Sequence, residues 1–202
     1  MFNDLKESIS TIAGMPVAQE RKEILKPLAE FIQKKADAGE RINLNFICTH
    51  NSRRSHLSQI WAQVMAAHFG IREVFCYSGG TEATAMFPKV AEILQNQGVE
   101  IQKLSDTDNP VYAVKYSENA HPVICFSKKY DDAFNPVSDF AAIMTCSNAD
   151  AGCPFIAGAG KRFAVKYEDP KASDGSPEMD LTYHNRSLEI AAEMHYVMSL
   201  IL

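Results

Sequence analysis

The sequence predicts one α/β domain, a three-layer sandwich with a mostly parallel sheet, preceded by an N-terminal helical extension over residues 1–40. Two observations support this prediction. From Ile42 onward, short apolar runs of strand length alternate with segments of helical periodicity, a pattern typical of parallel sheets covered by helices on both faces. The chain has 202 residues, of which 46% are hydrophobic, and this is enough for one well-packed core within residues 41–202.

Residues 1–40 predict two helices. One apolar stripe ends before Gly14 and a second ends near Gly39, and glycine is a common helix stop. The stripes consist of Leu5, Ile9 and Ile12, and of Ile24, Leu25, Leu28 and Ile32. We expect this extension to serve as a packing cap or as a dimer surface.

The α/β part begins with a strand over residues 42–47 and a helix over residues 55–69, which Gly70 closes. The inward face of this helix is predicted to carry Leu57, Ile60, Trp61, Val64 and His68. A strand over residues 74–77 is expected to end at a Ser78-Gly79-Gly80 turn. The next helix is predicted to begin at Pro88, with Val90, Ile93 and Leu94 inward, and to stop at Gly98.

Further strands are predicted over residues 111–116, 123–126, 141–145 and 163–167, followed by a last helix from about Pro177. The buried stripe of that helix is expected to carry Ile190, Met194, Val197, Met198 and Ile201. Residues 106–136 form a longer connection than a minimal fold of this kind needs, and they predict an added hairpin. Ligands of parallel sheets bind at the carboxyl ends of the strands, so we expect the functional site there.

The segment Cys48-Thr49-His50-Asn51-Ser52-Arg53-Arg54-Ser55 lies at such an end, between a strand and a helix. A loop of this length directs successive backbone N–H groups inward, and the helix adds its positive end, so residues 49–55 are predicted to bind a tetrahedral oxyanion. Cys48 at the base is expected to ionise easily and act as a nucleophile. Arg54 can grip two oxyanion oxygens, and Ser55 can donate to the thiolate. The alternative is a buried cysteine and a surface arginine at this spacing by chance.

The segment Cys146-Ser147-Asn148-Ala149-Asp150-Ala151-Gly152-Cys153-Pro154 carries two further cysteines. Their separation is wider than the two to four residues usual in zinc knuckles. The segment is rich in small and polar residues, so it can form a mobile loop, and two thiols on such a loop would suit disulfide exchange with a third. Taken alone, the segment favours the alternative, in which both cysteines are small buried hydrophobic residues. Cys76 lies in a predicted strand and Cys125 in an apolar run, and core packing is expected for both.

A carboxylic acid is needed to protonate the leaving oxygen when the cysteine attacks, and Asp169 is the candidate. It stands in Tyr167-Glu168-Asp169-Pro170, and an aspartate before proline favours an extended loop after a strand. The alternative is an ordinary Asp-Pro turn. Glu168 is expected to point away from Asp169, because adjacent side chains on an extended segment face opposite ways.

Composition excludes several classes of function. The N-terminus is polar and no apolar run approaches the length of a membrane span, so neither a secreted nor a membrane protein is expected. The five cysteines are an odd number without the spacing of a secreted disulfide framework, which favours the reducing cytoplasm. A net charge of −5 argues against nucleic acid as a partner. His121, His184 and His195 share no ligand spacing, so no metal site is predicted.

Two polar residues near the loop are also considered. His56 follows the loop directly and is predicted to be an exposed helix histidine. Ser78 is expected to face the loop and to help support it.

The three motifs, in this order, resemble the low-molecular-weight protein tyrosine phosphatases and the thioredoxin-coupled arsenate reductases that share their fold. The resemblance extends from Ile42 to the C-terminus. It implies that Cys48 is the nucleophile, Arg54 the anion clamp and Asp169 the general acid, while Asn51 braces the loop. His50 departs from a common glycine, Arg53 occupies a variable position, and Gln59 replaces an acidic potassium ligand of some reductases, so that ion is not predicted.

The same resemblance distinguishes two activities. In the reductases, the cysteine at the position of Cys146 resolves the nucleophile, and the one at Cys153 receives the disulfide that thioredoxin then reduces. Phosphatases follow Asp-Pro with aromatic residues that sandwich phosphotyrosine, whereas this chain has Lys171 and Ala172. The expected function is therefore arsenate reduction with no bound cofactor and thioredoxin as external reductant. The alternatives are a phosphate-ester hydrolase whose cysteine is regulated by oxidation and, with less support, a non-catalytic oxyanion sensor.

Overall fold

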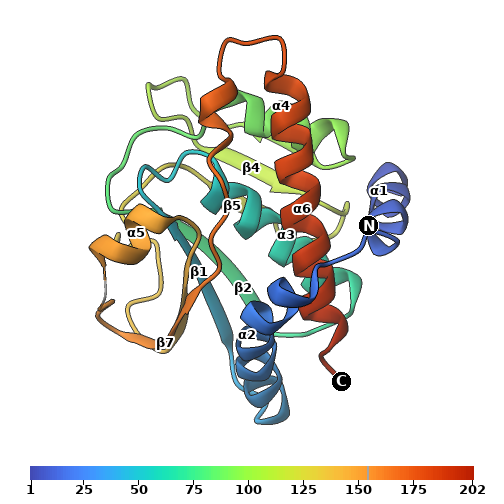
Figure 1. The fold of residues 1–202 in the computed structure, drawn as a ribbon, viewed down its shortest axis with the longest axis vertical. Coiled ribbons are helices and arrows are strands. Elements are labelled where there is room, and N and C mark those ends of the chain that lie inside the picture. The colour runs from blue at the N-terminus through green and yellow to red at the C-terminus, as the bar shows by residue number, and fades with distance from the viewer. Residues whose placement is uncertain (154) are drawn as a thin grey trace.

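The computed structural model describes residues 1–153 and 155–202 (Figure 1). Pro154, which ends the segment with two cysteines, lies outside the described residues. The helices are α1 (Asn3–Ala13), α2 (Gln19–Asp37), α3 (Arg54–His68), α4 (Pro88–Asn96), α5 (Ser147–Gly152), the 3₁₀ helix η1 (Pro170–Ser173) and α6 (Met179–Ser199). The strands are β1 (Ile42–Cys48), β2 (Val74–Gly80), β3 (Glu100–Lys103), β4 (Tyr112–Lys115), β5 (Val123–Cys125), β6 (Phe140–Met144) and β7 (Ala159–Ala164). Within the described residues, no helix has both the length and the apolar character needed to cross a bilayer.

Four parallel strands form the main sheet in the order β2-β1-β6-β7. The α/β class with a parallel sheet is therefore confirmed. All four strands end at the same edge, where Cys48 closes β1 and pairs with Gly80 of β2. The backbone N–H of Thr145, just after β6, donates to the carbonyl of Ile47, so the segment that begins at Cys146 starts beside Cys48.

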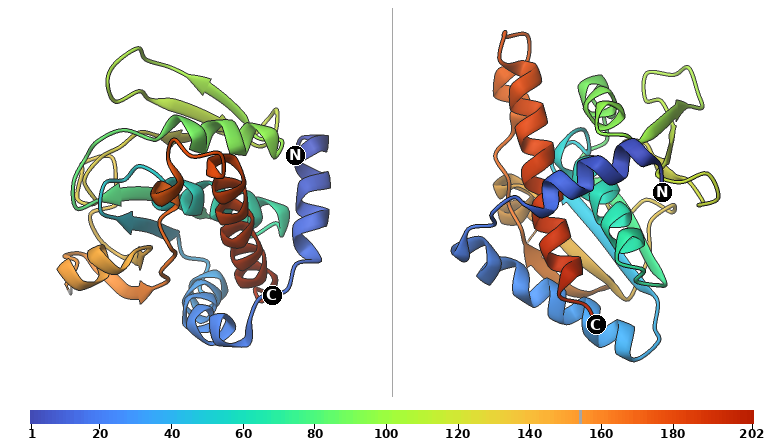
Figure 2. Two further views of the ribbon diagram at one scale, coloured as in Figure 1. Left: turned by 45° about the horizontal axis from the view of Figure 1, so that its top comes forward. Right: turned by 90° about the vertical axis from the view of Figure 1, so that its right-hand side faces the viewer.

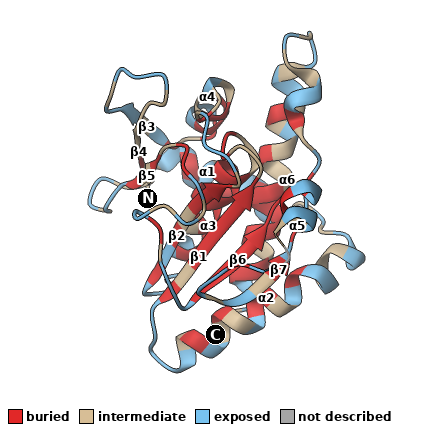
Figure 3. Cartoon of the chain, turned by 90° about the vertical axis from the view of Figure 1, so that its left-hand side faces the viewer, coloured by how far each residue is buried: buried red, intermediate tan, exposed pale blue. Residues whose placement is uncertain are grey.

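The two faces of this sheet are covered differently. Alternate residues of β1, including Leu44 and Phe46, pack into a large core with α1, α2, α3, α4 and α6. The opposite face carries Ile47, which packs into a smaller cluster with α5 and neighbouring loop residues. Figure 3 shows that β1 and β6 are buried along nearly their whole length between these two coverings. Helices thus dominate one face, whereas a short helix and loops cover the other.

The N-terminal extension forms the two predicted helices and belongs to the main core. Figure 2 shows α1 and α2 flanking α6, and both helices contact it. The predicted stripes are buried except for Ile24, which is 41% exposed. The extension is thus a packing cap on the domain, because its apolar stripes face α6 and the sheet.

Residues 106–136 contain the predicted hairpin, in which β4 and β5 pair antiparallel. β3, which was not predicted as a strand, joins them to make a second, three-stranded sheet. A single parallel bridge between Gly80 and Lys129 joins the chain segment after β5 to the outer edge of β2.

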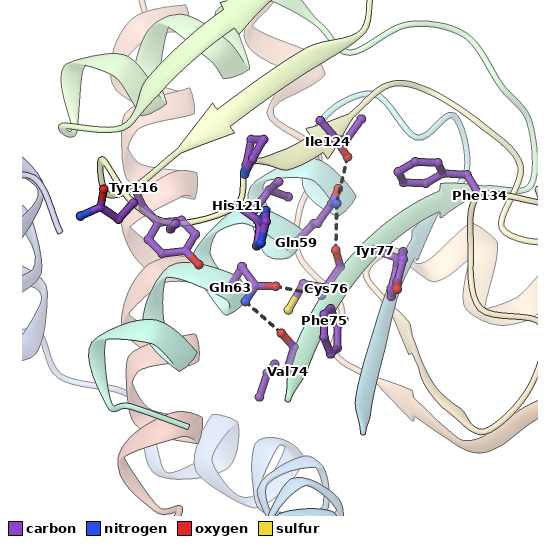
Figure 4. Close-up of a pocket in the computed structure, with 14 residues that line it drawn as sticks. Gln59, Gln63, Val74, Phe75, Cys76, Tyr77, Tyr116, His121, Ile124 and Phe134 are labelled. Atoms are coloured by element: carbon purple, nitrogen blue, oxygen red, sulfur yellow. Dashed lines mark hydrogen bonds between the residues drawn. The ribbon is translucent and has the colours of Figure 1, made fainter. Parts of the chain in front are cut away.

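Glutamine side chains cover the rest of that edge (Figure 4). Gln63 donates to the carbonyl of Val74 and accepts from the backbone N–H of Cys76, while Gln59 donates to the carbonyls of Cys76 and Ile124. These bonds satisfy an edge strand without adding another strand. The side chains of Gln59 and Gln63 line a cavity of about 440 Å³ between β2 and β5.

Three local predictions are wrong. Ser78-Gly79-Gly80 is not a turn, because these residues still pair with β1 and extend β2 to Gly80. The last strand ends at Ala164 and not at residue 167. The backbone N–H groups of Val165 and Tyr167 still donate to the carbonyls of Met144, at the end of β6, and of Thr145. His68 is exposed, because it lies in the last turn of α3, beyond the contact with the core.

Candidate active site

The loop after β1 turns its carbonyl groups outward. Each carbonyl oxygen from residue 48 to residue 54 accepts a hydrogen bond from outside the anion site; the donors belong to Thr81, Glu82, Thr84, Ser127, His56, Phe87, Leu57 and Ser58. Among the described residues, the backbone N–H groups of residues 49–56 have no acceptor. A loop with satisfied carbonyls and free amides at a helix start is a concave anion-binding nest.

Two features fix this loop shape. Asn51 adopts φ 44°, a left-handed conformation that asparagine tolerates better than most residues. Gly80 lies against the loop so closely that a Cβ atom there would stand 2.7 Å from the carbonyl oxygen of Thr49. His50, which replaces a common glycine, does not need a positive φ, and its side chain lies at the exposed rim 3.8 Å from Glu82. The departure at His50 is therefore compatible with the nest.

A directed chain of hydrogen bonds ends at the Cys48 sulfur. The Asn51 side-chain amide donates to the Ser55 hydroxyl at 2.8 Å, and Ser55 Oγ lies 3.1 Å from Cys48 Sγ. Because Ser55 Oγ accepts from Asn51, its own hydrogen is free to point at the sulfur. A donor aimed at sulfur stabilises the thiolate form that a nucleophile needs.

His56 contradicts the expectation of an exposed histidine, since it is completely buried beneath the loop. Its Nε2 lies 2.9 Å from the carbonyl oxygen of Asn51, which only accepts, so Nε2 carries the proton. Its Nδ1 lies 3.3 Å from the hydroxyl of Ser78, in agreement with the predicted supporting role of that serine. Burial, with the nearby Lys128 charge, lowers the pKa of His56 to about 3. A neutral imidazole therefore holds the left-handed residue in place.

This burial predicts a pH dependence of stability. The folded-state pKa lies below the usual unfolded value of about 6.5, so the unfolded chain takes up a proton that the folded chain refuses. The stabilising contribution is complete above pH 6.5 and is lost as the pH falls toward 3. Between pH 7.5 and 5, we expect the parent to lose about 2 kcal/mol more unfolding free energy than His56→Gln, measured by urea denaturation. His121→Gln, at an exposed position, is the control and should behave like the parent; equal slopes for all three proteins would contradict the prediction.

Arg54 and Asp169 meet at the open side of the nest. Arg54 Nη2 donates to Asp169 Oδ2 at 2.6 Å, and Nη1 donates to the carbonyl of Tyr167. Arg54 Nε is buried without a hydrogen-bond partner among the described residues, so its N–H remains available to a ligand. Glu168 is exposed, as expected from the alternation of side chains. The structure therefore brings the arginine, the carboxylate and the cysteine loop together.

Arg53 does not contribute its side chain to the anion site. Its guanidinium turns away and pairs with Asp174 and the hydroxyl of Tyr183. The backbone N–H of Arg53 remains part of the nest.

A buried network anchors the start of the acid segment. The Tyr167 hydroxyl donates to Glu193 Oε2 at 2.8 Å, and Arg21 of α2 donates two hydrogen bonds to the same carboxylate, at 2.6 and 2.7 Å. The hydrogen bond to Glu193 raises the pKa of Arg21, and burial raises that of Tyr167. The N-terminal extension is thus connected through α6 to the residue two positions before Asp169.

Cys146 lies beside the anion loop, residues 49–55. It is 2% exposed, shares the smaller apolar cluster with Cys48, and its sulfur is 3.4 Å from the Thr49 hydroxyl. The segment after Cys146 was predicted to be a mobile loop, but Ser147–Gly152 form helix α5. The Cys146 sulfur caps this helix by accepting from the N–H of Ala149 at 3.3 Å.

The other cysteines differ in their surroundings. Cys153 is half-buried at the far end of α5, and all five cysteines are free thiols. Cys76 and Cys125 are buried, as predicted, and burial raises the pKa of both thiols, that of Cys125 to about 12. Neither is suited to nucleophilic chemistry.

Comparison with known proteins shows which families this chain resembles. Residues 43–115 match the family model of low molecular weight phosphotyrosine protein phosphatases. This match confirms the family resemblance predicted from the sequence. The chain is also similar to an arsenate reductase of Staphylococcus aureus, with 27% identity over 73% of this chain and 91% of the relative, and to arsenate reductase 2 of Staphylococcus epidermidis, with 27% identity over 65% and 80%.

The phosphatase fold recurs in a solved low molecular weight phosphotyrosine phosphatase from Vibrio cholerae, at a TM-score of 0.50. It covers 78% of this chain and 94% of that protein, with 14% identity, so this likeness concerns the fold alone.

Several residues that support the anion loop were not predicted from the sequence. Ser127 donates to the carbonyl of His50, and the backbone N–H of Lys128 donates to the Asn51 side chain. Both residues come from the connection after the predicted hairpin, more than 70 positions from the loop. No local signal marks them, because their role depends on how the second sheet packs.

Proposed function

We propose that this protein reduces arsenate to arsenite, using Cys48 as nucleophile and Cys146 and Cys153 as a disulfide relay that thioredoxin regenerates. The similarity to arsenate reductases supports the reaction. The observation that carries the proposal is the position of Cys146, buried with Cys48 in one cluster and in contact with Thr49 of the anion loop. A phosphatase has no need for a second thiol at this place.

The first step binds arsenate to the amides of residues 49–55 and to Arg54. The Cys48 thiolate attacks arsenic, and the displaced oxygen leaves as water after Asp169 supplies a proton. The Cys146 thiolate then attacks the Cys48 sulfur. A disulfide forms, the arsenic–sulfur bond breaks, and its electron pair remains on arsenic, which leaves as arsenite.

The second step transfers the disulfide outward. Cys153 attacks Cys146, which frees Cys48 and leaves a Cys146–Cys153 disulfide for the two thiols of thioredoxin to reduce. Seven residues of helical rise place the Cα atoms of Cys146 and Cys153 about 10 Å apart, whereas a disulfide needs less than about 7 Å. The transfer therefore requires α5 to unwind. Its short length makes unwinding inexpensive, since isolated helices of this size are unstable.

Phosphate-ester hydrolysis is the second candidate, because the family model describes phosphotyrosine phosphatases. Cys48, Arg54 and Asp169 would suffice for it. The residues after Asp169 favour the smaller substrate, since Lys171 and Ala172 are exposed and offer no aromatic platform.

One experiment decides between the two. Arsenate turnover is measured with thioredoxin, thioredoxin reductase and NADPH, beside hydrolysis of p-nitrophenyl phosphate by the same preparation. The proposal expects NADPH oxidation that depends on both arsenate and thioredoxin, and that Cys48→Ser abolishes. Ester hydrolysis without any arsenate-dependent oxidation would establish the phosphatase.

A further inference from the structure

Three side chains from separate parts of the chain meet beside the anion loop. Arg53 Nη2 donates to Asp174 Oδ2 at 2.5 Å, and Arg53 Nε donates to the Tyr183 hydroxyl at 2.5 Å. The Tyr183 hydroxyl in turn donates to Asp174 Oδ1 at 2.6 Å, which closes a triangle. The guanidinium also lies over the ring of Phe87, 4.2 Å from its centre.

This triangle is largely shielded from water. The side chain of Arg53 is 13% exposed and that of Asp174 25%, while Tyr183 is fully buried. Burial, and then the hydrogen bond to Asp174, raise the pKa of Tyr183, so its hydroxyl stays protonated and can donate. A planar guanidinium that donates two directed hydrogen bonds and stacks on an aromatic ring is held rigidly. A lysine side chain could not reproduce this arrangement.

The position of the triangle gives it a functional meaning. Arg53 is the residue of the anion loop just before Arg54, whereas Asp174 directly follows η1, which itself follows Asp169. The buried Tyr167, bonded to Glu193, anchors the other side of this segment. Asp169 therefore lies on a stretch of chain that is tied down at both ends. Between the anchors, Asp169 is bonded to Arg54 and Pro170 is buried, whereas Lys171 and Ala172 are exposed.

We propose that Arg53 is a positioning residue that clamps the Asp169 segment to the anion loop through Asp174 and Tyr183. The clamp sets the distance between the carboxyl group and the Cys48 nucleophile before the substrate arrives. This proposal rests on the proposed function only for the role of Asp169 as proton donor. Displacing a catalytic group by about 1 Å can cost as much as about 10²-fold in rate, so the clamp would affect the chemical step more than anion binding.

The test compares Arg53→Met, Asp174→Asn and the double variant with Lys35→Met. Methionine keeps much of the length of arginine and can still cover Phe87. Lys35 is the matched control because its side chain is 10% exposed and pairs with Asp139 at 2.6 Å, at the opposite edge of the sheet. Each Arg53 or Asp174 variant should lower kcat for arsenate about 10- to 100-fold, with KM changed less than about 3-fold. The kcat of the double variant should be no lower than that of the less active single variant, because both substitutions break the same contact.

Hydrogen exchange of the backbone amides provides a readout that does not depend on activity. Arg53→Met should accelerate exchange over residues 168–176, whereas Lys35→Met should leave that stretch unchanged. Unchanged exchange in Arg53→Met would overturn the clamp, as would an equal loss of kcat in Lys35→Met or additive losses in the double variant. A parent that neither reduces arsenate nor hydrolyses esters would refute the proposed function, and exchange would still decide whether the clamp exists.

Discussion

Replacing Cys146 by serine is expected to limit arsenate reduction to at most one turnover per molecule. Serine keeps the size and the ability to accept from the N–H of Ala149, so α5 should remain capped. It cannot form the disulfide with Cys48 that releases arsenite. Cys153→Ser should stall one step later, with the Cys48–Cys146 disulfide trapped, and mass spectrometry of the non-reduced protein should identify that bond.

Any ester hydrolysis by the protein should survive both substitutions, because it needs only one thiol. Cys76→Ala is the control, since Cys76 is also a buried thiol but lies in β2 away from the anion loop. It should turn over arsenate like the parent. If Cys146→Ser and Cys153→Ser did so too, the relay would be wrong and the phosphatase function would be favoured.

Replacing Asp169 by asparagine should slow the chemical step about 10²–10⁴-fold, the usual contribution of a positioned acid. Asparagine has the same size, but its single carbonyl oxygen can replace only one of the two carboxylate oxygens that accept from Arg54 and from the N–H of Lys171. The hydrogen bond between Tyr167 and Glu193 should still hold the segment in position. It cannot deliver a proton. Arsenate binding, measured as protection of Cys48 from iodoacetamide, should therefore change little.

In the structure, the Asp169 carboxylate forms an ion pair with Arg54. To protonate the leaving oxygen, Asp169 must exchange this partner for the substrate during the proposed reaction. The incoming anion offers its oxygens to the guanidinium, which would release Asp169 toward the leaving oxygen. Glu168→Gln is the internal control, because Glu168 is the neighbouring carboxylate and points into solvent. A larger loss of turnover in Glu168→Gln than in Asp169→Asn would show that Asp169 is not the acid.

Most of the fold could be predicted from local patterns. The apolar periodicities located both N-terminal helices and most of the strands and helices after Ile42, since period and burial are linked for any amphipathic element. Short or atypical elements were missed for the same reason. β3 has only four residues, largely exposed, and α5 consists of small and polar residues without an apolar stripe.

By itself, the sequence located the loop after β1 and the candidate acid Asp169, because both are local. Strand, turn and helix start are contiguous around Cys48, so eight consecutive residues specify a nest of amides, and a proline specifies the extended backbone at Asp169. Only the tertiary structure decided where His56, Arg53 and Cys146 lie. Their surroundings come from α6, from β2 and the connection after β5, and from the neighbouring strand β6, all of which are remote in the chain. A helical or strand pattern specifies which face of an element is buried, but the side chains that meet there depend on which elements pack together.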